Sequence, residues 1–271
     1  MRYLGVSRAE LFSPNRTAGD AAVFRGVAAE LERSGHEVIC ISEQELESIP
    51  DGIDGIFQMA RSHEALAVLD QALVPVTNTV QAVRNCGRAA QIQLLKDSGT
   101  VPESQICRTA VEPVAWTLYP CWLKRADSHA VEKADVRFII DADDLHTAIK
   151  EFSDRGIREC VIQAHVKGWL VKFYGVRGFG LTDCYAASVR DGKFGLERFN
   201  DQPESGSVDM DALSAVAERA SDILGVDVYG GDAVVGEDGK ITIIDFNDWP
   251  SFRTCTVGAA QKIARLIMDK R

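Results

Sequence analysis

Residues 228–247, VYGGDAVVGEDGKITIIDFN, constrain the fold more than any other stretch of this sequence. Two runs rich in β-branched residues flank Asp238-Gly239, a dipeptide typical of tight hairpin turns. If these two residues form the loop, Glu237 faces Lys240, and the pairing of every other residue follows. A symmetric four-residue loop gives the same register, and a three-residue loop does not. The sequence therefore predicts a β-hairpin of defined register.

That register places Asp232 directly opposite Asp245, and Asn247 lies two residues further along the same face. Like charges that face each other across a hairpin destabilise it, unless a cation lies between them. Carboxylate and amide oxygens are the ligands that Mg²⁺ prefers, and Mg²⁺ usually also takes substrate phosphates. The pattern indicates a metal site; the alternative is two unpaired aspartates in water near strand ends.

Composition excludes several classes of protein. The 271 residues are 46% hydrophobic and 26% charged, which is typical of a soluble globular chain. The net charge is −10 and no run of Lys or Arg occurs, so we expect no nucleic-acid partner. The apolar runs are far shorter than the roughly 20 residues of a membrane span, and no signal peptide is visible. We therefore expect a cytoplasmic protein without a membrane partner.

The seven cysteines include no CxxC pair, so the sequence indicates neither a disulfide framework nor a zinc site. The first 84 residues alternate short apolar runs with a helical pattern over residues 17–33, which predicts a small α/β layer with a parallel sheet. A second helical segment is expected over residues 85–98. The fold class is therefore α/β.

The rest of the chain is richer in strands. Helices are expected over residues 141–155, about 209–224 and 256–270, between strand-like runs such as CWLKRA and LVKFYGV. We predict three lobes: an N-terminal domain over residues 1–84, a small central lobe over about 103–165 and a C-terminal lobe over about 166–271. The last two form one domain with the helix that precedes them, residues 85–271.

The hairpin resembles the metal-binding signature of ATP-grasp enzymes, in which an acid on one strand meets an acid-x-Asn and a proline on the next. The resemblance implies a three-lobed ATP-grasp fold with a Rossmann-like N-terminal domain. It also implies that Asp232, Asp245 and Asn247 hold magnesium ions that bridge the β- and γ-phosphates of ATP. Aspartate stands at 245 where many members have glutamate. Ser251 stands where many have glycine, which puts the local substrate contacts in doubt.

Other parts of the family pattern occur in the same order. Arg88 in NCGRAAQ matches a lysine that contacts the α-phosphate, although a solvated arginine at a helix start has the same pattern. Lys124 in PCWLKRAD matches a lysine that contacts the α- and β-phosphates. Residues ECVIQAHV match the hinge that reads adenine through its backbone, which makes Gln163, Ala164 and Val166 the adenine candidates. The glycine-rich flap of many members is absent.

The acceptor of the phosphoryl group is open. Residues around Arg61, Arg198 and Asn200 resemble α-L-glutamate ligases, in which the arginine matching Arg198 meets the γ-phosphate. That resemblance implies an ADP-forming carboxylate–amine ligase acting through an acyl phosphate, with Arg198 and Lys124 as catalytic cations. The small-molecule acceptor would then be a carboxylate, joined to an amine.

Two other stretches resemble inositol phosphate kinases. His129 in SHA would meet the substrate, and Lys172 in LVKFYGV would face phosphate. The alternatives are a surface histidine and an outward-facing strand lysine. The second candidate function is therefore a kinase that phosphorylates a hydroxyl of a polyol or inositol phosphate. The third is a nucleotide-binding protein without turnover.

Overall fold

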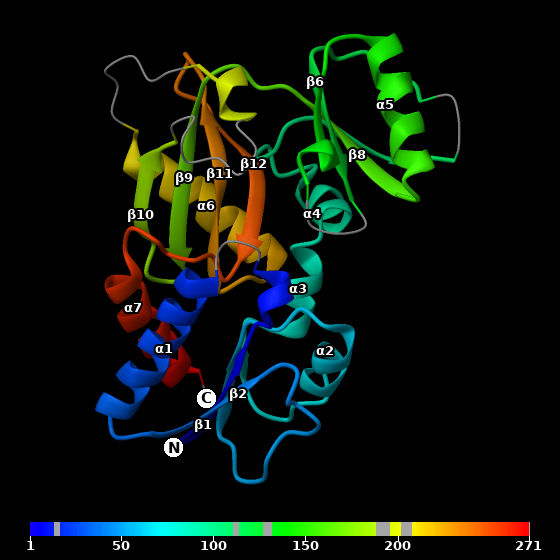
Figure 1. The fold of residues 1–271 in the computed structure, drawn as a ribbon. Coiled ribbons are helices and arrows are strands. Elements are labelled where there is room, and N and C mark those ends of the chain that lie inside the picture. The colour runs from blue at the N-terminus through cyan, green and yellow to red at the C-terminus, as the bar shows by residue number, and fades with distance from the viewer. Residues whose placement is uncertain (14–16, 111–113, 127–131, 188–195, 202–207, 271) are drawn as a thin grey trace.

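The chain folds into three four-stranded sheets with helices packed on them (Figure 1). This computed structural model describes all residues except 14–16, 111–113, 127–131, 188–195, 202–207 and 271. The side chains of Glu197 and Arg198 are not described either. The α/β class predicted from the sequence is confirmed. In the described part of the chain, the model shows no helix of the length and apolarity that crossing a membrane requires.

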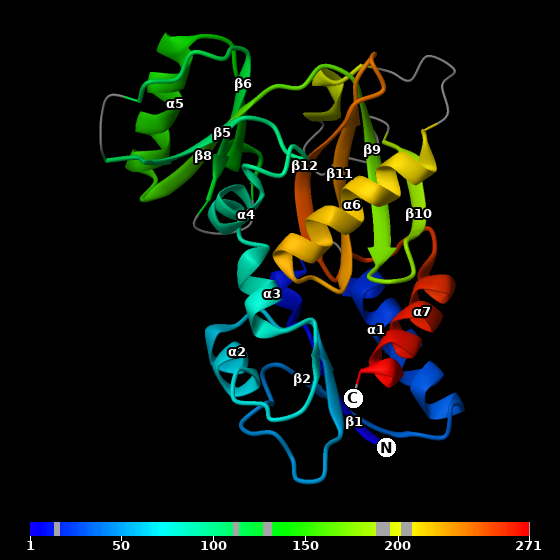
Figure 2. The same ribbon diagram turned by 180° about the vertical axis from the view of Figure 1, so that it is seen from behind.

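The N-terminal sheet is parallel, with strand order β2-β1-β3-β4. Helices α1 and α7 cover one face of this sheet and α2 covers the other (Figures 1 and 2). The predicted helix over residues 17–33 is confirmed, whereas α2 was not expected. The elements are β1 (Arg2–Ser7), the short 3₁₀ helix η1 (Glu10–Phe12), α1 (Thr17–Arg33), β2 (Glu37–Ser42), β3 (Gly55–Gln58), α2 (His63–Leu69) and β4 (Val76–Thr77).

The helix predicted over residues 85–98 is present as the shorter α4 (Arg88–Leu95), whereas α3 (Val80–Asn85) before it was not expected. The helices separate at Gly87, whose extended backbone makes it the N-cap of α4. Glycine is tolerated at an N-cap and weakens a helix interior, which explains the break. The break leaves Arg88 as the first residue of α4.

The central sheet is antiparallel, with order β5-β8-β6-β7, and α5 packs on one of its faces. In β6, Cys121 and Leu123 point into the core beneath α5, so Lys124 points to the opposite face. The elements are β5 (Ser104–Arg108), β6 (Cys121–Arg125), η2 (Lys133–Asp135), β7 (Val136–Ile139), α5 (Ala142–Asp154) and β8 (Glu159–Ala164).

The C-terminal sheet is also antiparallel, with order β10-β9-β11-β12, and α6 covers one face (Figure 2). Part of its other face shares a core with α1 and α7, so the first and last helices of the chain pack together. The elements are β9 (Trp169–Val176), β10 (Leu181–Ala186), η3 (Leu196–Phe199), α6 (Met210–Leu224), β11 (Val228–Val235), β12 (Ile241–Asp248) and α7 (Thr256–Asp269).

Candidate functional site

The hairpin of β11 and β12 opposes Asp232 and Asp245, as the sequence predicted, but by another route. The predicted two-residue loop is wrong. Gly236 pairs with Lys240, and the loop has three residues with Gly239 in the left-handed region, φ +77°. A β-bulge then corrects the register, because Ile244 is an extra residue between the pairs Ala233–Ile243 and Asp232–Asp245. The two departures cancel.

The two aspartates share one face of the hairpin with Asn247, whose side-chain amide donates to Asp245 Oδ2 at 3.0 Å. On the next strand, Lys172 is the direct partner of Asp232, and its Nζ lies 2.8 Å from Asp232 Oδ1. Among the described residues, no three His, Cys, Asp or Glu side chains cluster as metal ligands. The oxygens that the protein offers a metal on this face are those of the two carboxylates and the amide of Asn247.

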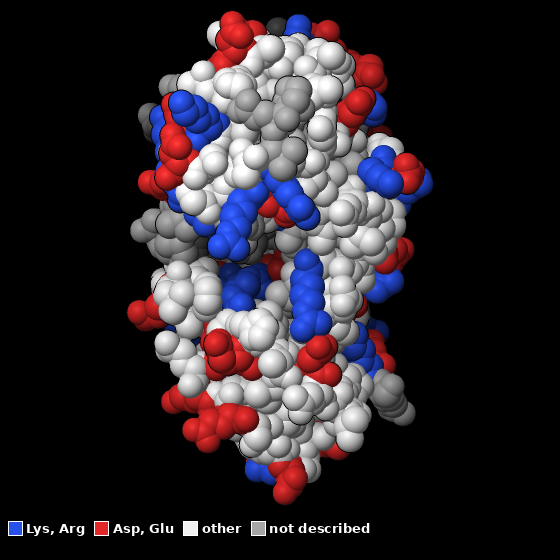
Figure 3. Space-filling model, turned by 90° about the vertical axis from the view of Figure 1, so that its right-hand side faces the viewer, with Lys and Arg blue, Asp and Glu red and all other residues white. Residues whose placement is uncertain are grey.

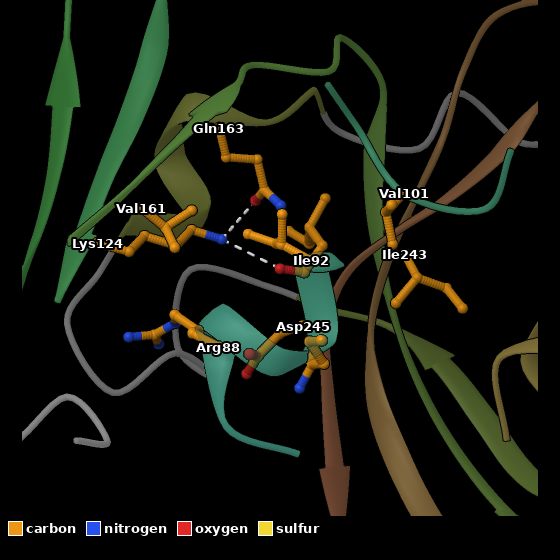
Figure 4. A pocket seen from close by; sticks show the side chains of 10 residues that line it. Arg88, Ile92, Val101, Lys124, Val161, Gln163, Ile243 and Asp245 are labelled. Atoms are coloured by element: carbon orange, nitrogen blue, oxygen red, sulfur yellow. Dashed lines mark hydrogen bonds between the residues drawn. The ribbon is translucent and has the colours of Figure 1, made fainter. Parts of the chain in front are cut away.

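Lys124 bridges the central and C-terminal sheets. Its Nζ donates to Gln163 Oε1 at 2.6 Å and to the carbonyl oxygen of the bulge residue Ile244 at 3.0 Å (Figure 4). Its nearest acceptors are thus neutral oxygens. Burial lowers the pKa of Lys124 to about 8, and the charge of Arg88 acts in the same direction. Asp245 and Asp232 only partly oppose this shift.

Arg88 is also held by a neutral group. Its guanidinium donates to the backbone carbonyl of Arg125 at 2.6 Å, and its buried Nε has no hydrogen-bond partner. Within the part of the chain that the structure describes, neither Arg88 nor Lys124 forms an ion pair with a carboxylate. A buried donor without a partner is costly, so this nitrogen indicates a place where a ligand could accept a hydrogen bond.

These cations line a pocket between α4, the central sheet and β12 (Figure 4). Seen from the side that carries the central sheet, Lys and Arg side chains gather around a hollow at mid-height of the molecule (Figure 3). The chain has a net charge of −10, so this gathering is local. The pocket is lined by Arg88, Gln91, Ile92, Val101, Lys124, Val161, Gln163, Ile243, Ile244 and Asp245.

Solved structures share the overall fold over nearly the whole chain. A RimK domain ATP-grasp protein from Sphaerobacter thermophilus superposes with a TM-score of 0.67 at 19% identity, covering 98% of this chain and 99% of its own. The D-alanine–D-alanine ligase of Bacillus anthracis, solved in complex with ATP, gives 0.71 at 13% identity, covering 100% and 97%. This chain has the ATP-grasp fold. Neither a family model nor a curated protein sequence matches it.

The predicted adenine hinge lies at the end of β8 (Glu159–Ala164). Gln163 lies in the pocket and accepts from Lys124. The N–H of Ala164 is already used, because it donates to the carbonyl of Glu103 at 2.9 Å. Val166 packs beside Leu170 and Ile244. The structure thus places all three adenine candidates near the pocket, and their contact with adenine stays a prediction.

Arg61 lies away from the pocket, between the N-terminal and C-terminal sheets. Its Nη1 and Nη2 donate to the two carboxylate oxygens of Asp248 at 2.8 and 2.7 Å, and both side chains are buried. Although burial lowers its pKa, Asp248 outweighs burial and raises the pKa of Arg61. The predicted substrate role of Arg61 stays untested. No sequence signal indicates its partner Asp248, which lies 187 positions away.

Two more arginine contacts belong to this interface. Arg8 forms a buried ion pair with Asp20 at 3.0 Å and donates to the carbonyl of Trp249 at 3.4 Å. Glu43 accepts three backbone N–H groups, those of Ala9, Arg61 and Ser62. We call Arg8, Asp20, Glu43, Arg61 and Asp248 the interface cluster.

Two further predicted residues, Ser251 and Asn200, lie outside the helices and strands. Ser251 is half-buried beside the first turn of α1. A Cβ added to Gly19 of that helix would lie 3.2 Å from the Cβ of Ser251. Asn200 is half-buried just after η3. His129 and the side chain of Arg198 lie outside the described residues, so their predicted roles stay predictions.

Proposed function

We propose that the protein is an ATP- and magnesium-dependent, ADP-forming carboxylate–amine ligase that acts through an acyl phosphate. One observation carries the nucleotide site: the buried Lys124 and the half-buried Arg88 line a shared pocket, and among the described residues their hydrogen-bond partners are neutral. A buried positive charge is costly unless it is paired. The phosphates of ATP would provide the missing negative charge.

The donor chemistry of Asp232, Asp245 and Asn247 fits a hard divalent cation. Mg²⁺ bound there would neutralise charge on the transferred phosphoryl group. Lys124 would move from its two neutral acceptors to the phosphates, and Arg88 would offer its unpartnered Nε to the same chain of oxygens. Both cations then stabilise the charge that develops during transfer.

A ligase is favoured over the other candidates by two considerations. Of the two solved structures compared above, one is described as an ATP-grasp RimK domain protein. The other is described as a D-alanine–D-alanine ligase in complex with ATP. A carboxylate acceptor is also ionised at neutral pH and needs no general base. A kinase acting on a hydroxyl would require one, or strong alignment by metal.

Thermal unfolding with and without ATP and Mg²⁺ tests the nucleotide site. In wild type, a hundredfold excess of nucleotide over its Kd should raise the free energy of unfolding by about 2.7 kcal/mol. Asp245→Ala should lose the magnesium-dependent part of this rise. Glu237→Ala, which removes an exposed carboxylate from the same hairpin, should keep it. No rise in wild type would refute the nucleotide site.

The fate of phosphate then separates ligase from kinase. With ATP and libraries of carboxylates and amines, a ligase releases one inorganic phosphate for each ADP formed. A kinase leaves the phosphate on its product, which appears by ³¹P NMR as a new phosphomonoester. ADP formation with a polyol and no release of phosphate would overturn the ligase proposal while keeping the nucleotide site.

A further inference from the structure

Two cysteines face each other inside the central sheet. Cys107 on β5 and Cys160 on β8 are direct partners in the antiparallel ladder, so their side chains leave the sheet on the same face. Both belong to the core beneath α5, where Cys107 is 7% exposed and Cys160 is fully buried. Of the chain's seven cysteines, all of them described and all free thiols, these two alone are partners across neighbouring strands.

The register of this pair suits a bond between the two sulfurs. The N–H of Thr109 donates to the carbonyl of Arg158, and these residues form the pair two positions beyond Cys107 and Cys160. Because the two types of pair alternate along an antiparallel ladder, the cysteines also form a hydrogen-bonded pair, with Cα atoms about 5.5 Å apart. That separation lies within the range of about 4.4–6.8 Å that disulfides span.

The two thiols also contact each other. Cys160 points at Cys107, with its Sγ 3.7 Å from the backbone carbonyl oxygen. Hydrogen bonding from the Cys160 thiol lowers the pKa of Cys107, although burial acts in the opposite direction. The thiolate is the nucleophilic form of cysteine, so Cys107 is the more reactive of the two. It is also the more accessible, since β5 is an edge strand of the sheet.

We propose that Cys107 and Cys160 form a reversible disulfide when the protein meets hydrogen peroxide. The Cys107 thiolate attacks one peroxide oxygen, so that an S–O bond forms and the O–O bond breaks. The hydroxide that leaves takes up the proton lost by Cys107 and becomes water. The Cys160 thiol then attacks the sulfur of the sulfenic acid, the S–S bond forms, and the hydroxyl group leaves with the thiol proton as a second water. Two thiols and one peroxide thus give one disulfide and two waters.

The spacing of the strands explains why this bond is reversible. The Cβ atoms of direct partners in a sheet lie about 4.5–5.5 Å apart, whereas a disulfide holds them about 3.5–4.5 Å apart. Closing the bond therefore draws β5 and β8 together, and the resulting strain makes the disulfide easier to reduce. On the opposite face of β8, Val161 and Gln163 line the pocket, so the bond acts on a strand of the pocket wall.

Mass spectrometry of the native protein tests the site. Hydrogen peroxide is added until the exposed Cys40 begins to be oxidised, the remaining thiols are blocked with N-ethylmaleimide, and the unreduced protein is digested with trypsin. In wild type we expect the peptide of residues 97–108 joined to that of residues 159–167, lighter than their sum by two hydrogens. Treatment of the oxidised protein with reduced glutathione should restore the two separate peptides.

Cys107→Ala and Cys160→Ala should each lose the linked product. Cys121→Ala is the matched control, because it removes a third buried cysteine from the same core and should keep the linked product. Absence of the linked product in wild type at the peroxide dose that oxidises Cys40 would overturn the proposal. Linkage of Cys107 mainly to another cysteine, or a linked product that forms only after unfolding, would overturn it as well. A linked product that glutathione does not reduce would contradict the reversible bond.

Discussion

The interface cluster and the pocket around Lys124 both enclose arginine or lysine side chains between sheets, but the hydrogen-bond partners of these side chains differ. In the interface cluster, Arg61 meets Asp248 through two hydrogen bonds, and Arg8 meets Asp20. In the pocket, Lys124 and Arg88 meet an amide oxygen and backbone carbonyls. Lys124 is 8% exposed, and the side chains of Arg8 and Arg61 are 11% and 12% exposed, so these three cations are buried to a similar degree.

The difference separates charges that hold the fold together from charges that await a ligand. A buried arginine whose two Nη groups meet one carboxylate is already neutralised, so it attracts a further anion less strongly. A buried lysine on neutral acceptors keeps its full charge and loses only two weak partners when a phosphate arrives. Burial alone therefore does not identify a binding site, whereas the charge of the partner does.

The largest expected effect tests the interface cluster. Arg61→Met should lower the free energy of unfolding by about 3–5 kcal/mol, because it leaves Asp248 buried and unpaired. Denaturant unfolding measures the loss. The matched control is Arg84→Met, whose ion pair with Asp70 is half exposed and should be worth less than about 1 kcal/mol. Equal losses in both variants would erase the distinction between buried and exposed pairs.

For Lys124→Met we expect a large effect on nucleotide affinity and a small effect on the free energy of unfolding. Hydrogen bonds to charged groups are worth about 1.5–3 kcal/mol, so nucleotide affinity should fall roughly 10- to 100-fold. Stability should change by less than about 1 kcal/mol, since relief of the buried charge offsets the two lost hydrogen bonds. Calorimetric titration with ATP and Mg²⁺ gives the affinity. An unchanged Kd would remove Lys124 from the phosphate site.

A more direct test of the difference between the two regions is to place a carboxylate beside Lys124. Gln163→Glu is nearly isosteric and places a negative charge where Lys124 now meets an amide oxygen at 2.6 Å. We expect ATP to bind about tenfold more weakly, because the new pair competes with phosphate. The same titration measures this, with Gln105→Glu on the neighbouring strand β5 as control. Tighter binding in Gln163→Glu would contradict the role of an unpaired ammonium.

The smallest effect is a dependence on pH. With a pKa of about 8 in the folded protein against 10.5 ordinarily, Lys124 loses its proton first in the native state. At pH 8.5 about a quarter of the molecules keep the charge, so ATP affinity should be roughly fourfold weaker than at low pH. Lys124→Met should lack this step. A flat profile in wild type up to pH 9.5 would argue against the lowered pKa.

The free energy of unfolding should change with pH in the opposite direction to ATP affinity. A lysine whose pKa is lowered by folding destabilises the native state while it is charged, which is the case below about pH 8. Between pH 8 and 10.5 the unfolded chain binds the extra proton, so this penalty is relieved as pH rises. The difference in unfolding free energy between wild type and Lys124→Met should therefore shift in favour of wild type across that window.

Much of the fold was predictable because its signals are local. The helix over Thr17–Arg33 follows from apolar spacing and a terminal glycine, and the structure has it with the same bounds. The helix predicted over residues 85–98 exists but is shorter, because α4 begins after its N-cap Gly87 and ends at Leu95. Helical periodicity reports which face is buried; it is less informative about where a helix is interrupted.

The site was predictable only in part. The opposition of Asp232 and Asp245 was confirmed although the loop was wrong, since a parity argument cannot detect a bulge that restores the register. Asp248 lies directly after Asn247 and was overlooked, because its partner Arg61 comes from another sheet. Contacts between distant segments depend on how the sheets pack, which one sequence without relatives does not reveal.

The bulge residue Ile244 has a consequence for insertions and deletions. Deleting it would join the pair Ala233–Ile243 directly to Asp232–Asp245 and leave an uninterrupted ladder, with every other partner unchanged. The hairpin would close, and the two carboxylates would still face each other. The deletion would remove the carbonyl that now accepts from Lys124 and the side chain that packs with Val166. The extra residue is thus dispensable for the ladder of the hairpin, and what it adds lies at the pocket: an apolar side chain and one acceptor oxygen.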